Sequence, residues 1–388
     1  MPRTKKTVFV AMSGGVDSSV AAALLKKQGY TVVGAFMRNW TQAVTGIATN
    51  QWQRDETDAR AVAEKLAIPF YAFDFEREYR RDVAGYMLRE YAVGRTPNPD
   101  VMCNKAIKFG LFLQRALEMG ADAIATGHYT RKFEFRISNF EINSKFKIRN
   151  LKLLVAKDTN KDQSYFLWTL AQEQLKYCLF PIGDYTKPEV RELARKFGLP
   201  TADKPDSQGI CFVGEVAVRD FLQEYLPVVP GPVLTAAGKR VGEHEGVAFY
   251  TIGQRRGVGS AGGGTPYYVI EKDAVRNALI VAEGADDPAL YGQELVAGEV
   301  NWISGGPPRL PLACKARIRY RQPLQEARIM NYELGMTKSE QPMIPDSRFL
   351  IRFDRLQRAI TPGQSVVFYR GREMLGGGVI CAARSGVV

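Results

Sequence analysis

The sequence predicts an α/β protein in which a doubly wound parallel-sheet domain is followed by a small β-rich central domain and a C-terminal β-barrel. Three observations lead to this prediction. Short β-rich runs alternate with helical stretches in the first half, which is typical of parallel βαβ units. After about residue 218, glycine and proline become frequent and short β-branched runs replace amphipathic helices. The length of 388 residues allows two or three domains.

The elements of the first half follow from hydrophobic periodicity and from the residues that end each run. Gly29, Gly120 and Gly198 follow the ends of helical patterns, and Pro69 and Pro200 prevent their continuation. The predicted strands cover residues 8–11, 31–37, 70–73 and 123–126. The predicted helices cover residues 16–28, 55–67, 77–93, 105–119 and 187–197.

The alternation weakens at residues 131–152, which hold seven basic and two acidic residues among Phe and Ile. A hairpin and a mobile basic insertion are both compatible with this composition. Further on, strands are expected at residues 316–320, 349–353 and 365–369. The predicted domains are residues 1–218, 219–290 and 291–388.

Charge and cysteine content narrow the class of protein. The 53 Lys and Arg exceed the 41 Asp and Glu by 12, and the sequence pI is near 9.4, which favours a polyanionic partner such as nucleic acid. No apolar stretch is long enough to cross a membrane. The five cysteines form no CxxC pair, so neither a disulfide scaffold nor a metal site is indicated. We expect a cytoplasmic protein.

A phosphate-binding loop is the sharpest local signal. A predicted strand leads directly into Ser13, Gly14 and Gly15, and a helix begins immediately afterwards. Two glycines let the backbone approach an anion, and the helix presents unpaired N–H groups and the positive end of its dipole. The GxxxxGK[ST] and GxGxxG patterns are absent. Asp17 beside Ser18 indicates the handling of Mg²⁺ and pyrophosphate.

This segment, Ser13-Gly14-Gly15-Val16-Asp17-Ser18, resembles the SGGxDS signature of the PP-loop ATP pyrophosphatases. Such enzymes cleave ATP between the α- and β-phosphates and adenylate a carbonyl oxygen. The motif alone leaves amidation, argininosuccinate formation, NAD synthesis and RNA thiolation open.

Two cysteines lie in polar loops. Cys103 follows the proline-rich residues 96–100 at the start of a predicted helix, where the helix N-terminus and Lys105 favour a reactive thiolate. Cys211 follows the charged residues 203–208. On these grounds alone a chemical and a structural role stay equally open for both. The other three, Cys178, Cys314 and Cys381, lie in apolar runs and are expected to be core residues.

Further motifs, in order along nearly the whole chain, resemble the bacterial tRNA-specific 2-thiouridylase family. They comprise Thr96-Pro-Asn-Pro-Asp100 with Cys103, Lys161-Asp-Gln-Ser-Tyr-Phe-Leu167, Asp206-Ser-Gln-Gly-Ile-Cys-Phe212, Tyr250-Thr-Ile-Gly-Gln-Arg255, Arg319-Tyr-Arg321 and Thr361-Pro-Gly-Gln-Ser-Val-Val-Phe-Tyr369. The resemblance implies an enzyme that converts the wobble uridine of tRNA to 2-thiouridine, with ATP and Mg²⁺, a protein persulfide donor and no resident metal. It would act as a monomer.

The resemblance also implies a role for particular residues. Cys211 would receive sulfur as a persulfide, and Cys103 would act as the nucleophile. The residues implied to hold ATP are Ala11, Met12, Ser13, Gly14, Gly15, Val16, Asp17, Ser18, Met37 and Gly127. Those implied to contact the target base are Asn98, Pro99 and Asp100. Those implied to contact tRNA are Lys161, Asp162, Gln163, Arg319 and Tyr320.

The chemistry agrees with these roles, because an amide-like C2 oxygen leaves only after adenylation and a persulfide needs a second thiolate to open it. Whether Cys103 and Cys211 form a disulfide or share a metal cluster stays open. Two other readings remain: a PP-loop ligase or amidotransferase acting on a small molecule, and a tRNA-binding protein with a degenerate loop.

Three smaller expectations concern basic residues. Lys315, Arg317, Arg319 and Arg321 recur at every second position, so a strand would place all four on one face as a phosphate-binding stripe. His128 could be a base, a ligand or a structural residue. His244 is expected in a turn.

Overall fold

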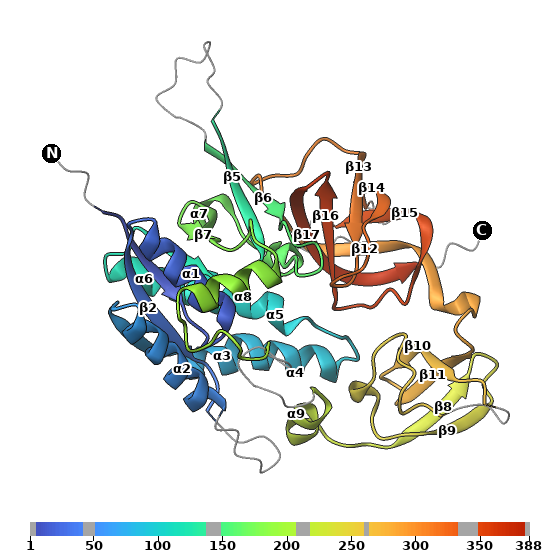
Figure 1. The fold of residues 1–388 in the computed structure, drawn as a ribbon. Helices are drawn as coiled ribbons and strands as arrows, with labels where there is room; N and C mark the ends of the chain where they lie inside the picture. The colour runs from blue at the N-terminus through green and yellow to red at the C-terminus, as the bar shows by residue number, and fades with distance from the viewer. Residues whose placement is uncertain are drawn as a thin grey trace.

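The computed structural model describes residues 5–41, 51–136, 149–206, 218–259, 264–332 and 348–384. In these residues the chain forms a five-stranded, a four-stranded and an eight-stranded sheet (Figure 1). The predicted fold class is confirmed. No helix in the described ranges is long and apolar enough to cross a membrane.

The N-terminal sheet is parallel and has the strand order β3-β2-β1-β4-β7. The strand order reverses between β1 and β4, and the carboxyl edge at such a switch point is where open α/β sheets bind ligands. The strands are β1 (Thr7–Ala11), β2 (Thr31–Arg38), β3 (Phe70–Asp74), β4 (Ala123–Thr126) and β7 (Cys178–Leu179).

Helices cover both faces of this sheet (Figure 1). Alternate residues of β1 face opposite sides, so Val8 and Val10 join one core cluster while Phe9 and Ala11 join the other. The first face packs against α1 (Val16–Lys27), α2 (Gln51–Lys65) and α8 (Lys187–Lys196). The second packs against α3 (Glu76–Tyr79), η1 (Arg80–Ala84), α4 (Gly85–Ala92), α5 (Pro99–Met102), η2 (Cys103–Phe112) and α6 (Leu113–Glu118).

One predicted helix begins six residues earlier than expected. The helical run predicted from residue 105 starts at Pro99, because the Asn98 side chain accepts a hydrogen bond from the backbone N–H of Val101 at 3.3 Å and proline suits the first helical position. The run continues without a break through the π-helical η2. Cys103 is therefore the fifth residue of a helix rather than its first.

The basic segment forms a hairpin in its described part. Antiparallel strands β5 (Thr130–Arg136) and β6 (Arg149–Val155) pair throughout, and β6 also pairs with β17 (Glu373–Arg384) of the C-terminal sheet. The hairpin interpretation is thus confirmed for these strands, while residues 137–148 lie outside the described ranges. Between β6 and α8 the chain forms η3 (Ser164–Leu167), then α7 (Gln172–Leu175), and then strand β7.

The central part of the chain is a small sheet with the order β10-β11-β8-β9. His244 lies in a strand rather than in the predicted turn, since it is the last residue of β9 and pairs with Gly231. It is 1% exposed, its Nδ1 accepts from the Gly246 N–H, and its Nε2 donates to the Asn277 carbonyl at 3.0 Å. The elements are α9 (Val218–Tyr225), β8 (Gly231–Thr235), β9 (Arg240–His244), η4 (Val247–Phe249), β10 (Tyr267–Asp273) and β11 (Ala278–Glu283).

The C-terminal strands close into a six-stranded barrel, because β12 pairs with both β15 and β17. Alternating apolar residues such as Ile351 and Phe353 fill its interior. After η5 (Pro288–Leu290), the strands are β12 (Tyr291–Trp302), β13 (Leu312–Arg317), β14 (Gln325–Asn331), β15 (Phe349–Arg358), β16 (Ser365–Arg370) and β17.

The predicted stripe of four cations is wrong, because β13 ends at Arg317 and the chain leaves the sheet there. Lys315 is exposed and paired with Glu326 at 3.0 Å. Arg317 is only 8% exposed, and its guanidinium lies 4.9 Å from the centre of the Tyr369 ring. Arg321 is exposed on a backbone with φ of +63°. The four residues therefore share no face.

The burial of Arg317 generates a stability prediction. Its guanidinium lies 3.7 Å from the carboxylate of Asp162, which is 2% exposed. Replacing Arg317 by Met leaves that buried charge without its cation, so we expect the free energy of unfolding to fall by roughly 3 kcal/mol. Lys315→Met on the same strand removes an exposed pair and is the control, with an expected loss below about 1 kcal/mol. Urea denaturation measures both, and equal losses would contradict the structural role of Arg317.

Candidate functional site

The phosphate loop connects the carboxyl end of β1 to α1. Gly14 has φ of +72°, and a Cβ on it would lie 2.3 Å from the carbonyl oxygen of Asp55, so this position requires glycine. Among the described side chains none caps the first turn of α1. Its first backbone N–H groups can therefore bind an anion, with the helix dipole adding to the attraction.

The residues implied to hold ATP come together around this loop. Ala11 pairs with Thr126 of β4, the residue before Gly127, and with Ala35 of β2, two residues before Met37. Gly127 lies directly on α1, because a Cβ there would be 2.6 Å from the backbone nitrogen of Ser18. The loop backbone is itself braced, since the Ser13 N–H donates to Ser18 Oγ at 3.2 Å. The structure thus assembles the predicted set at one edge of the sheet.

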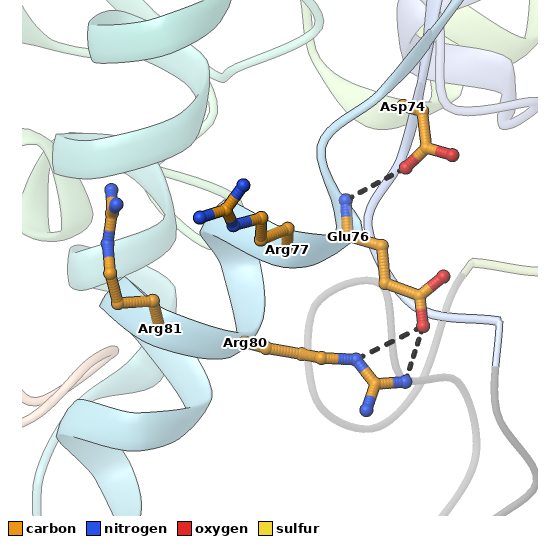
Figure 2. A pocket seen from close by; sticks show the side chains of 5 residues that line it. All are labelled: Asp74, Glu76, Arg77, Arg80 and Arg81. Carbon is orange, nitrogen blue, oxygen red and sulfur yellow. Dashed lines mark hydrogen bonds and ion pairs between the residues drawn. The ribbon is translucent and has the colours of Figure 1, made fainter.

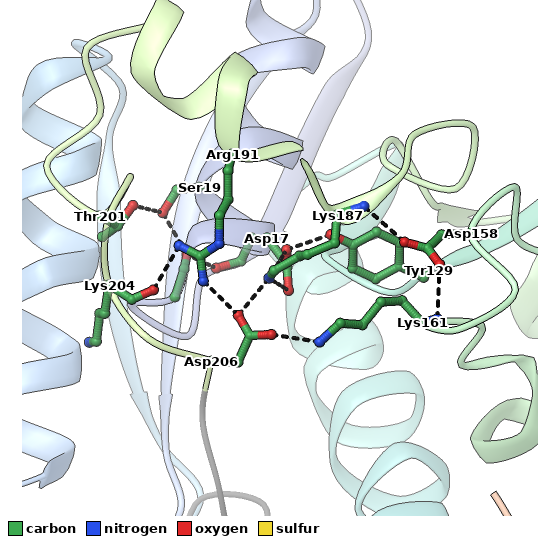
Figure 3. Close-up of polar contacts among 12 residues, drawn as sticks. Asp17, Ser19, Tyr129, Asp158, Lys161, Lys187, Arg191, Thr201, Lys204 and Asp206 are labelled. Atoms are coloured by element: carbon green, nitrogen blue, oxygen red, sulfur yellow. Dashed lines mark hydrogen bonds and ion pairs between the residues drawn. The ribbon is translucent and has the colours of Figure 1, made fainter. Parts of the chain in front are cut away.

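Asp17 is the centre of a polar cluster that the sequence did not reveal (Figure 3). The ammonium group of Lys187 lies 2.7 and 2.9 Å from its two carboxylate oxygens, and the Tyr129 hydroxyl donates to one of them at 2.8 Å. Burial first, and then the charge of Asp17, raise the pKa of Tyr129, so this phenol stays protonated and acts as a donor. The Lys187 side chain is only 11% exposed.

Lys187 owes its position to the start of α8. It is the first residue of this helix, and the Glu189 carboxylate accepts hydrogen bonds from the backbone N–H and the hydroxyl of Thr186 just before it. The backbone N–H of Lys187 donates to Asp158 at 2.9 Å. The Thr-x-x-Glu pattern marks this helix start in the sequence, but nothing in the sequence shows that Lys187 reaches Asp17.

Asp206 joins the same cluster and receives three cations. Its carboxylate lies 2.6 Å from Lys161, 2.8 Å from Lys187 and 3.0 Å from Arg191 (Figure 3). Burial works to raise the pKa of this carboxyl, but the hydrogen bonds and charges of Lys161 and Lys187 outweigh it and hold the pKa at about 2. Asp206 is therefore fully ionised at neutral pH.

A further ion pair closes the other side of the phosphate loop. The ammonium group of Lys204 lies 2.7 Å from Asp55 and 2.5 Å from Asp58. Burial alone would lower the pKa of Lys204, but the hydrogen bonds that it donates to both carboxylates raise it overall. Because the backbone of Asp55 lies against Gly14, this pair fixes α2 beside the loop.

The residues implied to contact the base lie at the start of the helix that contains Cys103. Asn98 caps that helix, Pro99 is its first residue, and both are partly exposed together with Asp100. Cys103 is fully buried. The next residue, Asn104, donates from Nδ2 to the Phe166 carbonyl at 3.1 Å and so ties the helix to the segment around residues 161–167.

Within that segment, all three implied tRNA contacts have structural partners, and that of Lys161 is Asp206. The buried Asp162 accepts hydrogen bonds from the Ala156 N–H at 3.1 Å and from the Ser164 hydroxyl at 2.9 Å. Gln163 Oε1 accepts from the Tyr129 N–H at 2.9 Å. Burial is the main cause of the raised pKa of Asp162. Direct RNA contact by these side chains stays a prediction.

Arg319 and Tyr320 lie against the same segment. The Tyr320 ring centre is 4.6 Å from that of Phe166, so two motifs far apart in the sequence meet. Arg319 donates to the carbonyl of Ala359 at 2.8 Å and approaches that of Ile252 at 3.4 Å, which links the barrel to the central sheet.

The cysteines and His128 fall into distinct environments. Cys178 and Cys314 are buried, and burial raises the pKa of each thiol to about 12, which fits the predicted core role. Cys381 is partly buried. Cys211 lies in residues 207–217, outside the described ranges. His128 is 7% exposed, hydrogen-bonded to Thr126 at 2.8 Å, and burial holds its pKa well below the usual value, which favours a structural role.

No group of three or more His, Cys, Asp or Glu in the described ranges could hold a metal ion. A hollow at the end of β3, apart from the phosphate loop, is lined by Asp74, Glu76, Arg77, Arg80 and Arg81 (Figure 2). Its two acids are already engaged, since Glu76 binds Arg80 and Asp74 accepts from the backbone N–H of Glu76. The phosphate loop and its cluster therefore remain the candidate site.

Three family descriptions match consecutive parts of the chain. Residues 6–215 match the tRNA methyl transferase HUP domain, residues 219–283 match the tRNA methyl transferase PRC-barrel domain, and residues 292–380 match the Aminomethyltransferase beta-barrel domain.

Curated relatives match over nearly the full length. A protein of Geobacillus thermodenitrificans is 48% identical over 374 residues, covering 96% of this chain and 94% of its own. Another, of Burkholderia vietnamiensis, is 49% identical over 387 residues, covering 99% and 96%. A third, of Shouchella clausii, is 46% identical over 378 residues, covering 97% of each. All three are named tRNA-specific 2-thiouridylase, and at this identity and coverage the chain belongs to that family.

Proposed function

We propose that this protein is an ATP-dependent tRNA sulfurtransferase. It adenylates the C2 oxygen of the wobble uridine and replaces that oxygen with persulfide sulfur, giving 2-thiouridine, AMP and pyrophosphate. The observation that carries the proposal is the identity of 48–49% with tRNA-specific 2-thiouridylases over nearly the whole chain. The geometry supports it, because a glycine-rich anion loop, a helix N-terminus and Lys187 converge at the switch point of the sheet.

In the first step the uridine C2 oxygen attacks the α-phosphorus of ATP, and the bond to the β-phosphate oxygen breaks. The N–H groups of α1 and the backbone at Gly14 and Gly15 would bind the departing pyrophosphate. Lys187, which Asp17 and Asp206 hold in place, would supply positive charge there. Among the described residues Asp17 Oδ2 accepts a hydrogen bond from Lys187 only, so it keeps a lone pair with which it would hold Mg²⁺ together with the substrate phosphates. When bound, Mg²⁺ neutralises developing phosphate charge.

In the second step the terminal sulfur of a Cys211 persulfide attacks C2, and AMP leaves with the original oxygen. The Cys103 thiolate then attacks Cys211 Sγ and breaks the sulfur–sulfur bond, so one sulfur stays on the base and a disulfide joins the cysteines. An external thiol must reduce that disulfide before the next cycle. The C2 oxygen of a stacked base is inaccessible, so the nucleotide must flip out of the anticodon stack.

The proposal includes the wider assignments. It divides the chain into domains at residues 1–218, 219–290 and 291–388. It also includes a protein persulfide donor, a monomeric state and a cytoplasmic location. The formal charge of +12 supports binding to a polyanion. The proposed phosphate contacts are Lys161, which is half-buried, and Arg321, which is exposed. Both lie near the contact between Phe166 and Tyr320.

Purified protein, ATP and unmodified tRNA test the proposal directly, with nucleoside mass spectrometry as the readout. Thiolation with one AMP released per 2-thiouridine supports it. The family description of the N-terminal domain mentions methyl transfer, and a methylated nucleoside without AMP release would replace the proposal by that activity. AMP release that does not depend on tRNA would indicate a small-molecule ligase.

The first prediction concerns the adenylation step. Lys187→Met removes the cation that Asp17 and Asp206 hold, so we expect kcat/KM for ATP-dependent AMP formation to fall roughly 10²- to 10³-fold. Asp17→Ala should abolish AMP formation, and tRNA affinity should change little in both variants. Lys157→Met on an exposed pair with Glu189 is the control. Normal AMP formation by the Lys187 variant would remove this residue from the mechanism.

The second prediction concerns the cysteines. Cys211→Ser should block persulfide loading from a protein donor, yet leave some thiolation when free sulfide is in excess. Cys103→Ser should load sulfur on Cys211 and fail to deliver it to adenylated tRNA. Cys178→Ala is the control, because this thiol is buried and protonated. Mass spectrometry of each variant after donor treatment tracks the added sulfur, and normal thiolation by Cys211→Ser with the protein donor would refute the assigned roles.

The third prediction concerns tRNA affinity. Arg321 has no acidic partner among the described residues, and its guanidinium lies 5.1 Å from the Tyr320 ring centre. If it binds one phosphate, Arg321→Gln should lower the slope of log affinity against log salt by about 0.9 or slightly less. The control is Lys315→Gln, since Glu326 already pairs with this lysine. Filter binding at several salt concentrations gives both slopes, and identical slopes would exclude Arg321 from the interface.

A further inference from the structure

We propose that the barrel turn at residues 361–364 is a positioning element for the loop that leads into the Cys103 helix. Gly363 and Gln364 are the positioning residues. The inference rests on the proposed function, because it assigns to the C-terminal barrel a part in placing the residues that would face the base and the sulfur. The contact joins residues 268 positions apart in the sequence.

Three hydrogen bonds fix the loop to the turn. The backbone N–H of Thr96 donates to the Pro362 carbonyl at 2.9 Å. The side-chain amide of Gln364 donates to the carbonyl of Thr96 at 2.9 Å and to that of Pro97 at 3.0 Å. All the groups on the loop side belong to the backbone. The turn therefore holds the path of two consecutive peptide units, whatever side chains the loop carries.

Gly363 lets the turn lie directly on the loop. Its φ is +93°, and a Cβ there would be 2.8 Å from the carbonyl carbon and oxygen of Thr96 and 2.9 Å from its nitrogen. These are backbone atoms, which cannot swing aside as a flexible side chain would. Any side chain at residue 363 must push the loop away from the barrel.

The turn itself is firmly held. The Gly363 N–H donates to the Ile380 carbonyl at 2.8 Å, and the Ile380 N–H donates to the Gln364 carbonyl at the same distance. Ile380 belongs to β17, which closes the barrel. Next to the turn, the buried Tyr165 hydroxyl donates to the Ser365 carbonyl at 2.9 Å. A rigid sheet thus supports the contact to the loop.

The loop leads directly into the helix that contains Cys103, so the position of the loop determines the position of that part of the candidate site. Asn98 caps the helix directly after Pro97, and the helical run continues through Cys103 without interruption. Because a helix moves as a unit, a shift of Thr96 and Pro97 moves the implied base contacts and the Cys103 thiol together. Group transfer tolerates little misplacement, and an error of about 1 Å can reduce the rate roughly 100-fold.

The test uses the full-length chain with Gly363→Ala and the matched control Gly305→Ala. Gly305 has φ of +89°, and a Cβ there would meet nothing within 4 Å. Both substitutions impose the same left-handed backbone conformation on alanine, but only residue 363 touches the loop. We expect Gly363→Ala to lower kcat for thiolation at saturating tRNA by roughly tenfold or more. The tRNA dissociation constant, persulfide loading and thermal midpoint should match those of Gly305→Ala.

A second readout does not depend on catalysis. Hydrogen exchange of the backbone amides of residues 98–104 should be faster in Gly363→Ala than in Gly305→Ala, because the helix start has lost its support. Gln364→Met removes both hydrogen bonds that the side-chain amide donates but keeps a side chain of similar length, so it should reproduce the faster exchange. If Gly363→Ala does not fold, the result for Gln364→Met decides whether the turn positions the loop. Unchanged exchange overturns the inference, as does a parallel loss of kcat, tRNA affinity and thermal midpoint, which would indicate general unfolding. If exchange changes but the wild-type protein thiolates no tRNA, the positioning stands and the proposed function fails.

Discussion

The ion pair between Lys187 and Asp17 is the interaction on which the arrangement of the site depends. It joins the first turn of α1 to the first residue of α8, and Lys187 also binds Asp206. The Lys187 side chain is nearly buried, so solvent screens these charges little, and each partner would be costly to leave alone. A single ammonium group therefore fixes the phosphate loop, the α8 helix and the residue that precedes the segment containing Cys211. In the proposed mechanism the same cation would also stabilise the departing pyrophosphate, which would give one residue a structural and a chemical use.

Contacts between domains connect the barrel to the N-terminal domain that holds the phosphate loop. The hairpin of β5 and β6 follows β4 of the parallel sheet in the chain and pairs with β17, so these two strands extend the sheet of the barrel to eight strands. One apolar core cluster includes residues from all three sheets, such as Phe9, Val233 and Tyr369. The barrel thus shares a packed core with the N-terminal domain, and its turn at Gln364 contacts the loop before Cys103.

The charged surface of the molecule is less simple than its excess of basic residues suggests. Two cations of the alternating basic pattern at residues 315–321 are used internally: Arg317 lies on Tyr369, and Arg319 binds backbone carbonyls. Net charge predicts attraction to a polyanion, but it does not show which side chains remain available to bind one. Fewer residues of the alternating pattern are therefore available for phosphate contact than the sequence implied, and Arg321, which we propose as one such contact, lies beside the Tyr320 ring.

The sequence by itself determined the fold class, the phosphate loop and the family, because these depend on local periodicity and on long contiguous motifs. The glycines between Ser13 and Ser18 and the helix that follows them predict the turn from local sequence. The structure adds only that the backbone of Asp55 lies against Gly14. What the tertiary structure decided were pairings over long separations. The reach of Lys187 to Asp17, the burial of Arg317 and the contact of Gly363 with Thr96 follow from how sheets and helices pack. Side-chain alternation along a strand holds only while the strand continues, and the point at which β13 ends is set by its neighbours in the barrel rather than by its own residues.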